Sequence, residues 1–279
     1  MKNKYKTILM VIIMVATSTT IISCNAQNGK VITQERKTIP YSKIQVSDGW
    51  DLILSQGDEY SIKITANENL LDGLKTEVID DVLIISSTTK VIKGKGIRKK
   101  VYLTFIEVNE IIANKDSDIS AETTIKSNTL NIELHDDSDL DNVKFEGANL
   151  IARLTGSSEM NMSVTSTKHI DAKVEGSSEI SLTEIRTDTF KLILSDDSEA
   201  DLVGFTKEFD AQASNESEIK ANELRVTNCL LNLSSSSEAE IIIEDTLDVT
   251  LSGNSELELI GSPNFLNKEV CKSCEIEMK

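Results

Sequence analysis

The sequence predicts an all-β chain wound into a parallel β-helix (β-solenoid) of about 20-residue coils, preceded by a β region that caps its N-terminal end. A serine followed by an acid recurs from Ser117 to Ser255 at steps of 18 to 21 residues. Apolar residues alternate on both sides of each serine, which is typical of strands with one buried face. One repeat of this size cannot bury its own apolar face, but stacked repeats can.

Each coil is expected to contain a strand, a tight turn, a second strand and a linking segment. Apolar residues stand eight, six and four positions before the serine, as in Leu130, Ile132 and Leu134. The turns are rich in Asp, Asn, Gly and Ser, which favour tight turns. An antiparallel sandwich of hairpins is the alternative. Such a sandwich has no reason to repeat on every second strand, so we favour the solenoid over residues 109–279.

Residues 35–108 also read as β structure and are expected to form the cap. Alternating apolar positions predict strands around residues 44–46, 52–54, 62–64 and 82–85, and residues 69–74 read as a turn or one helical turn. An open end of the stack would expose core and strand edges, which such a cap covers.

The first 23 residues read as a lipoprotein signal peptide. Lys2, Lys4 and Lys6 precede an apolar stretch that is too short to span a bilayer as a helix. The run Ile21-Ile22-Ser23-Cys24 resembles the lipobox of bacterial lipoproteins, in which the cysteine receives the lipid. Ordinary signal cleavage with an incidental cysteine is the alternative. We expect Cys24 to be lipidated and residues 24–34 to form a tether.

The net charge of −17 argues against nucleic-acid binding, because phosphates attract the opposite sign. The expected membrane contact is the lipid anchor, and the expected location is the cell envelope, at the outer membrane. The residues after Cys24 lack the acidic run associated with surface export, which favours the periplasmic face.

Several segments are similar to the GIN domain, described as the head domain of putative autotransporter adhesins. They are residues 44–58, 69–71 and 80–85, the turns at 155–158 and 175–178, and the ending at 251–263. The resemblance covers about residues 35–279 and implies a right-handed β-helix in an exported lipoprotein, with no assigned activity. Several coils replace the family's glycine turn with Asp-Asp-Ser or Asn-Glu-Ser.

The acid after each serine is expected to form one ladder along the rod. Unit charges about 5 Å apart repel by roughly 0.8 kcal/mol in water. A strip that binds Ca²⁺ is one interpretation, and carboxylates that splay into water and limit aggregation are the other. The ladder comprises Asp118, Asp139, Glu159, Glu179, Glu199, Glu218, Glu238 and Glu256, with Glu275 following a cysteine in a ninth copy.

The cysteines offer a second motif. Cys271 and Cys274 form a CxxC, which in an exported protein fits a disulfide. A redox or zinc site lacks the required context or further ligands. Cys229 occupies an apolar position and reads as core.

A basic patch stands out on this acidic chain, and we interpret it mainly as a solvated loop. Docking to lipid headgroups, an acidic glycan or another copy's acids is the alternative. The patch comprises Lys93, Lys95, Arg98, Lys99 and Lys100.

No catalytic residue is expected. The serines lack an adjacent base, because His135 and His169 fall in different columns. A glycan-active β-helix enzyme would need a groove with clustered carboxylates, and Arg153, Arg186 and Arg225 are not expected in one column. The sequence therefore predicts a non-catalytic, adhesin-like module that binds a protein or glycan. A glycan-active enzyme and a structural spacer are the alternatives.

Overall fold

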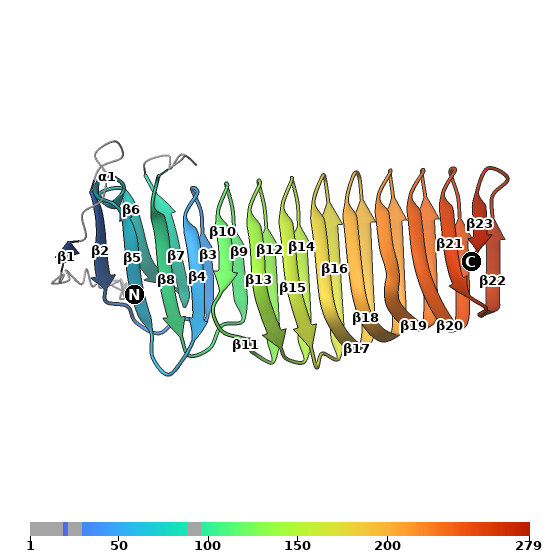
Figure 1. The fold of residues 1–279 in the computed structure, drawn as a ribbon, viewed down its shortest axis with the longest axis horizontal. Helices are drawn as coiled ribbons and strands as arrows, with labels where there is room; N and C mark the ends of the chain where they lie inside the picture. Colours follow the sequence, from blue (N-terminus) through green and yellow to red (C-terminus); the bar gives the residue numbers. More distant parts are fainter. Residues whose placement is uncertain (1–18, 22–29, 89–95) are drawn as a thin grey trace, which may run out of the picture.

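The computed structural model describes residues 19–21, 30–88 and 96–279, which form one rod of stacked β coils (Figure 1). The rod is a β-solenoid of about eight turns with coils of about 20 residues, so the predicted fold class is confirmed.

Two parallel sheets line the rod, one on each side of the serine turns. Sheet 1 contains β8 (Lys99–Phe105), β4 (Asp51–Gln56), β10 (Asp118–Ala121), β13 (Asp139–Glu146), β15 (Glu159–Thr165), β21 (Glu256–Gly261) and β23 (Glu275–Met278). Sheet 2 contains β7 (Val82–Ser87), β3 (Lys43–Val46), β9 (Glu110–Ala113), β12 (Thr129–Leu134), β14 (Asn149–Leu154), β16 (His169–Glu175) and β22 (Asn264–Val270).

Four long strands pass from one sheet to the other, because their N-terminal halves pair in sheet 1 and their C-terminal halves in sheet 2. They are β17 (Glu179–Ser195), β18 (Glu199–Ser214), β19 (Glu218–Ser234) and β20 (Glu238–Leu251). The short β11 (Ile125–Lys126) pairs with the end of β13.

Equivalent residues of successive coils lie directly above one another. Leu130 pairs with Leu150, Leu150 with Ile170, and Ile170 with Phe190, and all four side chains are buried. Phe190 packs against Phe209 of the next coil with ring centroids 5.2 Å apart. The apolar columns therefore form one continuous core between the sheets.

The serines of the repeat are buried at the turns, and the hydroxyls of most of them donate to backbone carbonyls. The Ser117 hydroxyl donates to the Asn114 carbonyl at 2.8 Å, and Ser217 donates to Ser214 at 2.9 Å. A serine fits here because its small side chain satisfies a buried carbonyl within the turn.

The N-terminal coils do not follow chain order. The coil of β3 and β4 lies between the β7–β8 coil and the β9–β10 coil, since each of its strands pairs with both neighbours. The same two sheets therefore run through both of the expected regions, 35–108 and 109–279.

Antiparallel strands extend both sheets beyond this first coil. β5 (Ser61–Asn67) pairs with β8, β2 (Val31–Arg36) with β5, β1 (Thr19–Ile21) with β2, and β6 (Leu74–Ile79) with β7. The single helical turn α1 (Glu68–Leu71) lies in the expected segment. Residues 31–34, expected in the tether, are in β2 instead, because they bond to β5. The role of this region as a cap stays a prediction.

The expected signal peptide lies outside the described residues, apart from the short β1, and so do Cys24, Lys93 and Lys95. No helix in the described part of the chain is long and apolar enough to cross a membrane.

Candidate binding surface

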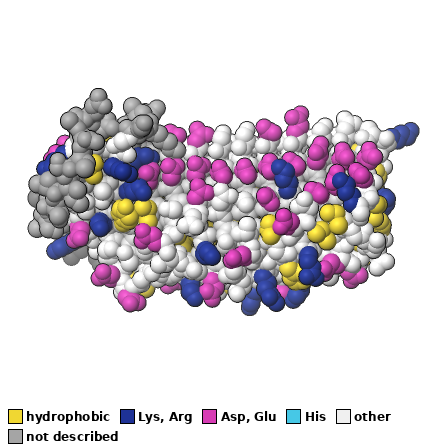
Figure 2. All heavy atoms as spheres, viewed as in Figure 1, with side chains coloured by type: hydrophobic (Ala, Val, Ile, Leu, Met, Phe, Trp, Pro, Cys, Tyr) yellow, Lys and Arg dark blue, Asp and Glu magenta, His cyan; other side chains and the backbone are white. Residues whose placement is uncertain are grey.

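The acid ladder runs along the outer face of sheet 1, directly after the turns. Asp118 pairs with Asp139, and the register then continues coil by coil through Glu159, Glu179, Glu199, Glu218, Glu238, Glu256 and Glu275. Figure 2 shows the resulting row of Asp and Glu side chains along the rod. The spacing in the sequence therefore does bring these carboxylates together.

The ladder begins one coil earlier than the sequence pattern indicates. Asp51 pairs with Asp118, and Lys100 pairs with Asp51 on its other side. The position of the repeat serine is occupied by Trp50 in the coil of Asp51 and by Lys99 in the coil of Lys100. Both side chains are buried. The missing serine is why the repeat pattern did not include Asp51.

Lys99 corrects the prediction of a solvated basic loop. Lys99 and Lys100 are in β8, and Lys99 is only 6% exposed. Its Nζ donates to the Gly49 carbonyl and lies 2.5 Å from Asp51 Oδ1 and 4.0 Å from Asp118 Oδ2. This side chain is therefore an internal counter-ion for the first acids of the ladder.

The remaining acids have few counter-ions. Lys220 lies in the outward column next to the ladder, two residues after Glu218, and bonds to Glu199 and Glu218. The hydrogen bond to Glu199 raises the pKa of Lys220. The pKa of Glu179 is raised by burial and by the neighbouring charges of Glu199 and Glu159. The ionised carboxylate of Glu179 therefore opposes folding at neutral pH.

We expect Glu179→Gln to raise the melting temperature at pH 7. The pKa of Glu179 in the folded state lies above its unfolded value, so its charge destabilises the fold at neutral pH and this cost disappears as the pH falls through the folded pKa. The difference between variant and wild type in thermal unfolding should therefore shrink toward pH 4.

Asp188→Asn is the matched control, because a hydrogen bond from Lys207 lowers the pKa of Asp188. This substitution should leave the melting temperature at pH 7 unchanged or lower it slightly. A lower melting temperature for Glu179→Gln at pH 7 would contradict the prediction.

Acids gather most densely at the C-terminal end of the ladder, where a second outward column is also acidic. A hollow of about 170 Å³ is lined by Glu218, Glu238, Ala239, Glu240, Glu256 and Glu258. Carboxylate oxygens of Glu256, Glu258 and Glu277 lie within 4.8 Å of one another, and Lys279 contacts Glu258 at 2.7 Å. Calcium binding at these carboxylates stays a prediction. If the site binds calcium, CaCl₂ should raise the melting temperature more than NaCl of equal ionic strength does.

A second strip on sheet 1 contains two of the three arginines, although the three together do not share a column, as expected. Arg186 pairs with Phe205 and Phe205 with Arg225, so two of the three arginines lie in one outward column two coils apart. Ile242 and Ile260 continue this column. Arg153 is on sheet 2, where it contacts Asp171 at 2.9 Å. We call the column from Arg186 to Ile260 the arginine–aromatic strip.

Cations and an aromatic ring are available to a partner on this strip. The Arg225 guanidinium lies 6.0 Å from the Phe205 ring centroid and contacts Glu244 at 2.7 Å. Arg186 is exposed, and its guanidinium makes no ion pair with the described residues. Figure 2 shows Lys and Arg side chains together with some Asp and Glu along the lower edge of the rod, below the acidic row.

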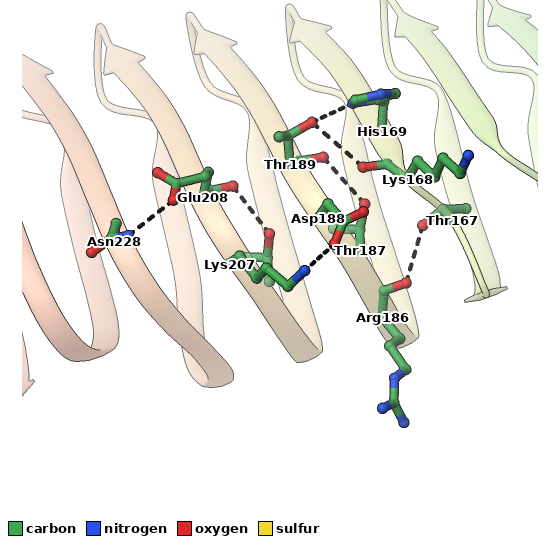
Figure 3. A network of polar contacts seen from close by, with 11 residues as sticks. Thr167, Lys168, His169, Arg186, Thr187, Asp188, Thr189, Lys207, Glu208 and Asn228 are labelled. Carbon is green, nitrogen blue, oxygen red and sulfur yellow. Dashed lines mark hydrogen bonds and ion pairs between the residues drawn. The ribbon is translucent and has the colours of Figure 1, made fainter.

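The histidines and serines do not form a nucleophile–base pair in the described part of the chain. His135 and His169 each bond through Nδ1 to a threonine hydroxyl of the next coil, at 2.7 Å to Thr155 and 2.6 Å to Thr189. Figure 3 shows His169 in a network of coil-to-coil contacts that includes Lys207 with Asp188 and Asn228 with Glu208. These polar groups stabilise the stacking of coils.

Cys271 and Cys274 are joined by a disulfide in the turn between β22 and β23. Cys229 is buried and unpaired, and burial raises the pKa of its thiol. This thiol is therefore protonated at neutral pH and packs as a core residue.

Comparison with protein families identifies the architecture. The model of the family "Putative auto-transporter adhesin, head GIN domain" matches residues 40–192 and 162–263. The chain belongs to this GIN-domain family. The GIN-domain match spans the reordered N-terminal coils and nearly all of the regular coils, as the resemblance implied.

Solved structures share the same fold. A putative adhesin from Parabacteroides merdae is 21% identical, with a TM-score of 0.62 over 90% of this chain and 97% of the other. A putative adhesin from Parabacteroides distasonis is 19% identical, with a TM-score of 0.62 over 90% and 98%. A putative lipid-binding protein from the same species is 21% identical, with a TM-score of 0.59 over 90% and 98%. No curated protein matches this GIN-domain chain.

Proposed function

We propose that this GIN-domain protein is a non-catalytic, lipid-anchored module of the cell envelope that attaches to a protein or glycan. Membership of the adhesin-head family carries the proposal. The anchor is Cys24, behind the signal sequence of residues 1–23, and the location is the outer membrane, with the periplasmic face favoured. Nucleic acid is not a partner, because the chain carries a net charge of −17.

The hydrogen bonds made by the serines and histidines support a non-catalytic role. Most repeat serines donate to backbone carbonyls, and both histidines bond to threonines. The coils are nearly uniform, so sheet 1 offers a long surface with repeated columns. Such a surface suits an extended partner that contacts several coils at once, with each contact adding to the affinity.

The arginine–aromatic strip is the part of sheet 1 best suited to hold a partner. Arginine and aromatic side chains are enriched among residues that dominate binding energy at interfaces. An exposed guanidinium also donates two parallel hydrogen bonds to a carboxylate. A glycan that carries only sparse carboxylates and lies along the rod therefore fits Arg186 and Phe205, whereas a polymer charged at every unit is repelled by the net charge of −17.

The purified protein should be retained on immobilised dextran that carries sparse carboxymethyl groups more strongly than on neutral dextran, and neither polymer should be cleaved. Arg186→Ala and Phe205→Ala should each weaken retention about tenfold, as the loss of one strong interface contact does. Arg153→Ala on sheet 2 is the matched control and should leave retention unchanged. Cleavage that is lost on mutating a surface acid would instead favour the glycan-active enzyme.

Proteinase treatment of intact and lysed cells, followed by blotting, tests the location. Protection until lysis is expected for a periplasmic rod. Digestion on intact cells would place the rod outside and make adhesion to other cells or host glycans the role to test. Equal retention of all variants on every polymer would favour the structural spacer.

A further inference from the structure

The two arginines of the arginine–aromatic strip are spaced two coils apart in one outward column. Arg186 pairs with Phe205, and Phe205 pairs with Arg225. Neighbouring strands of a sheet are about 4.8 Å apart, so the two arginine positions are separated by about 10 Å along the rod. Phe205 lies one coil from each of them. The strip therefore presents a cation, an aromatic ring and a second cation at equal steps.

Both guanidinium groups can donate to a ligand. Figure 3 shows the Arg186 guanidinium extending away from the coil-to-coil network. The Arg225 side chain is 64% exposed and contacts one carboxylate oxygen of Glu244 through Nε and Nη2, each at 2.7 Å. A guanidinium carries five N–H donors, so the edge formed by Nη1 and Nη2 can still donate to a second carboxylate. The contact with Glu244 also orients the Arg225 side chain before a ligand arrives.

The acid ladder lies far from the strip. Glu199 of the ladder stands six positions before Phe205 on β18, and Glu218 stands seven positions before Arg225 on β19. A strand rises about 3.3 Å per residue, so these separations are up to roughly 20 Å. The Debye length at physiological salt is only about 8 Å. A short ligand that occupies the strip is therefore largely screened from the ladder.

Acids closer to the strip restrict where a ligand carboxylate can lie. Two exposed glutamates, Glu184 and Glu223, each stand two positions before an arginine of the strip. In the coil of Phe205, the neighbouring cation Lys207 already bonds to Asp188. A carboxylate placed over Phe205 would therefore face nearby acids without a free cation. The strip favours carboxylates at its two arginines and a neutral group between them.

A glycan matches this spacing better than a peptide does. Side chains on one face of an extended peptide are about 7 Å apart, or about 13 Å for the next pair, and neither length equals the separation of about 10 Å. A pyranose unit of an extended β-linked chain has about the length of one coil step. Carboxylates on the two sugars that flank a neutral sugar can therefore meet both arginines. The neutral ring then lies on Phe205, because the negative face of an aromatic ring attracts C–H groups.

We infer that the strip binds a glycan segment in which one neutral sugar separates two carboxylate-bearing sugars. Arg186 and Arg225 each donate two parallel hydrogen bonds to one carboxylate, and Phe205 contacts the neutral ring between them. The inference rests on the proposed function. It adds Arg225 as the residue that makes binding depend on the spacing of the charges.

Two synthetic β-linked trisaccharides of equal length and charge test this inference. Each contains two glucuronates and one glucose, with the glucose at the centre in the first and at one end in the second. Isothermal titration of the full chain in a nonionic detergent should show that the first binds about tenfold more tightly, because only it reaches both arginines. Arg225→Ala should abolish this preference by weakening the first trisaccharide alone. Lys220→Ala, which removes a sheet 1 cation outside the strip, is the matched control and should leave the preference unchanged.

The outcomes separate this inference from the proposed function. Equal affinity for the two trisaccharides, with retention on carboxymethyl dextran that still depends on Arg186, would overturn the inference and leave the proposed function in place. A preference that survives Arg225→Ala would also overturn the inference. Failure of the proposed function has a different signature, because neither the dextran nor either trisaccharide would then bind, and both proposals would be wrong.

Discussion

Lys99→Met is expected to lower the free energy of unfolding by about 2–3 kcal/mol at pH 7, because it removes the buried partner of Asp51. Removing one partner of a buried ion pair typically costs about 3–5 kcal/mol. The expected value is smaller because the Asp51 side chain keeps 28% of its exposure. Methionine retains the packing of the lysine stem, so the loss reports the ammonium group.

The pH dependence of this loss identifies its cause. Burial raises the pKa of Asp51, and the hydrogen bond and charge of Lys99 act against that rise. Without Lys99 the pKa rises further, so protonation of Asp51 on acidification relieves the unpaired charge. Urea unfolding should therefore show a smaller difference from wild type at pH 4.5 than at pH 7.

Lys115→Met is the matched control for this experiment. Lys115 contacts Asp48 at 3.2 Å but is 63% exposed, and exposed pairs contribute about 0–1 kcal/mol. A loss for Lys99→Met that is no larger than that of Lys115→Met would contradict the assignment of Lys99 as an internal counter-ion.

Gly204→Ala is expected to be at least as damaging. Gly204 has φ +141°, and a Cβ at this position would lie 2.2 Å from the Ile185 carbonyl oxygen and 2.7 Å from the Ile185 nitrogen. The backbone conformation alone costs a non-glycine residue about 1–3 kcal/mol. The contact with Ile185 adds to this cost, because both atoms belong to the neighbouring coil and cannot rotate away. Urea unfolding should show the loss as a lower midpoint.

Gly57→Ala is the control for the glycine substitution. A Cβ at Gly57 would meet only the Thr104 Cγ2 methyl, at 3.0 Å, and that side chain can rotate. The midpoint should therefore fall much less than for Gly204→Ala. Similar midpoints for the two variants would show that β17 and β18 tolerate a wider separation at Gly204.

The regular coils could be predicted from sequence because the repeat along the chain equals the number of residues in one stacked coil. Apolar positions before each serine, such as Leu150, Ile170 and Phe190, lie in one buried column, and the acids after each serine lie in one exposed column. In these segments each coil pairs with the next without insertion, so counting from the serine is sufficient.

The arginine–aromatic strip could not be predicted in this way. Arg186, Phe205 and Arg225 stand eight, seven and eight positions after their serines, and Ile242 stands five after its own. Register shifts after Leu182, Asp201 and Ala221 absorb these differences and align the side chains. A bulge changes the count without leaving a distinct residue signature.

The order of the first coils could not be predicted from sequence for a different reason. Lys99 and Trp50 occupy the serine column, but their neighbours in the stack are far apart in the sequence. Local pattern identifies the strands around residues 44, 52 and 83, yet only long-range pairing sets their order.

That order has a consequence for how the rod assembles. Every coil after residue 110 packs on a coil that precedes it in the chain, so it can be added with short loop closures. The coil of residues 43–56 must instead wait for residues 82–105 on one side and 110–121 on the other. Non-local closures of this kind slow folding. We therefore expect the strands of the first coils, β3, β4 and β7 to β10, to assemble slowly, and the remaining coils to add to them in one direction.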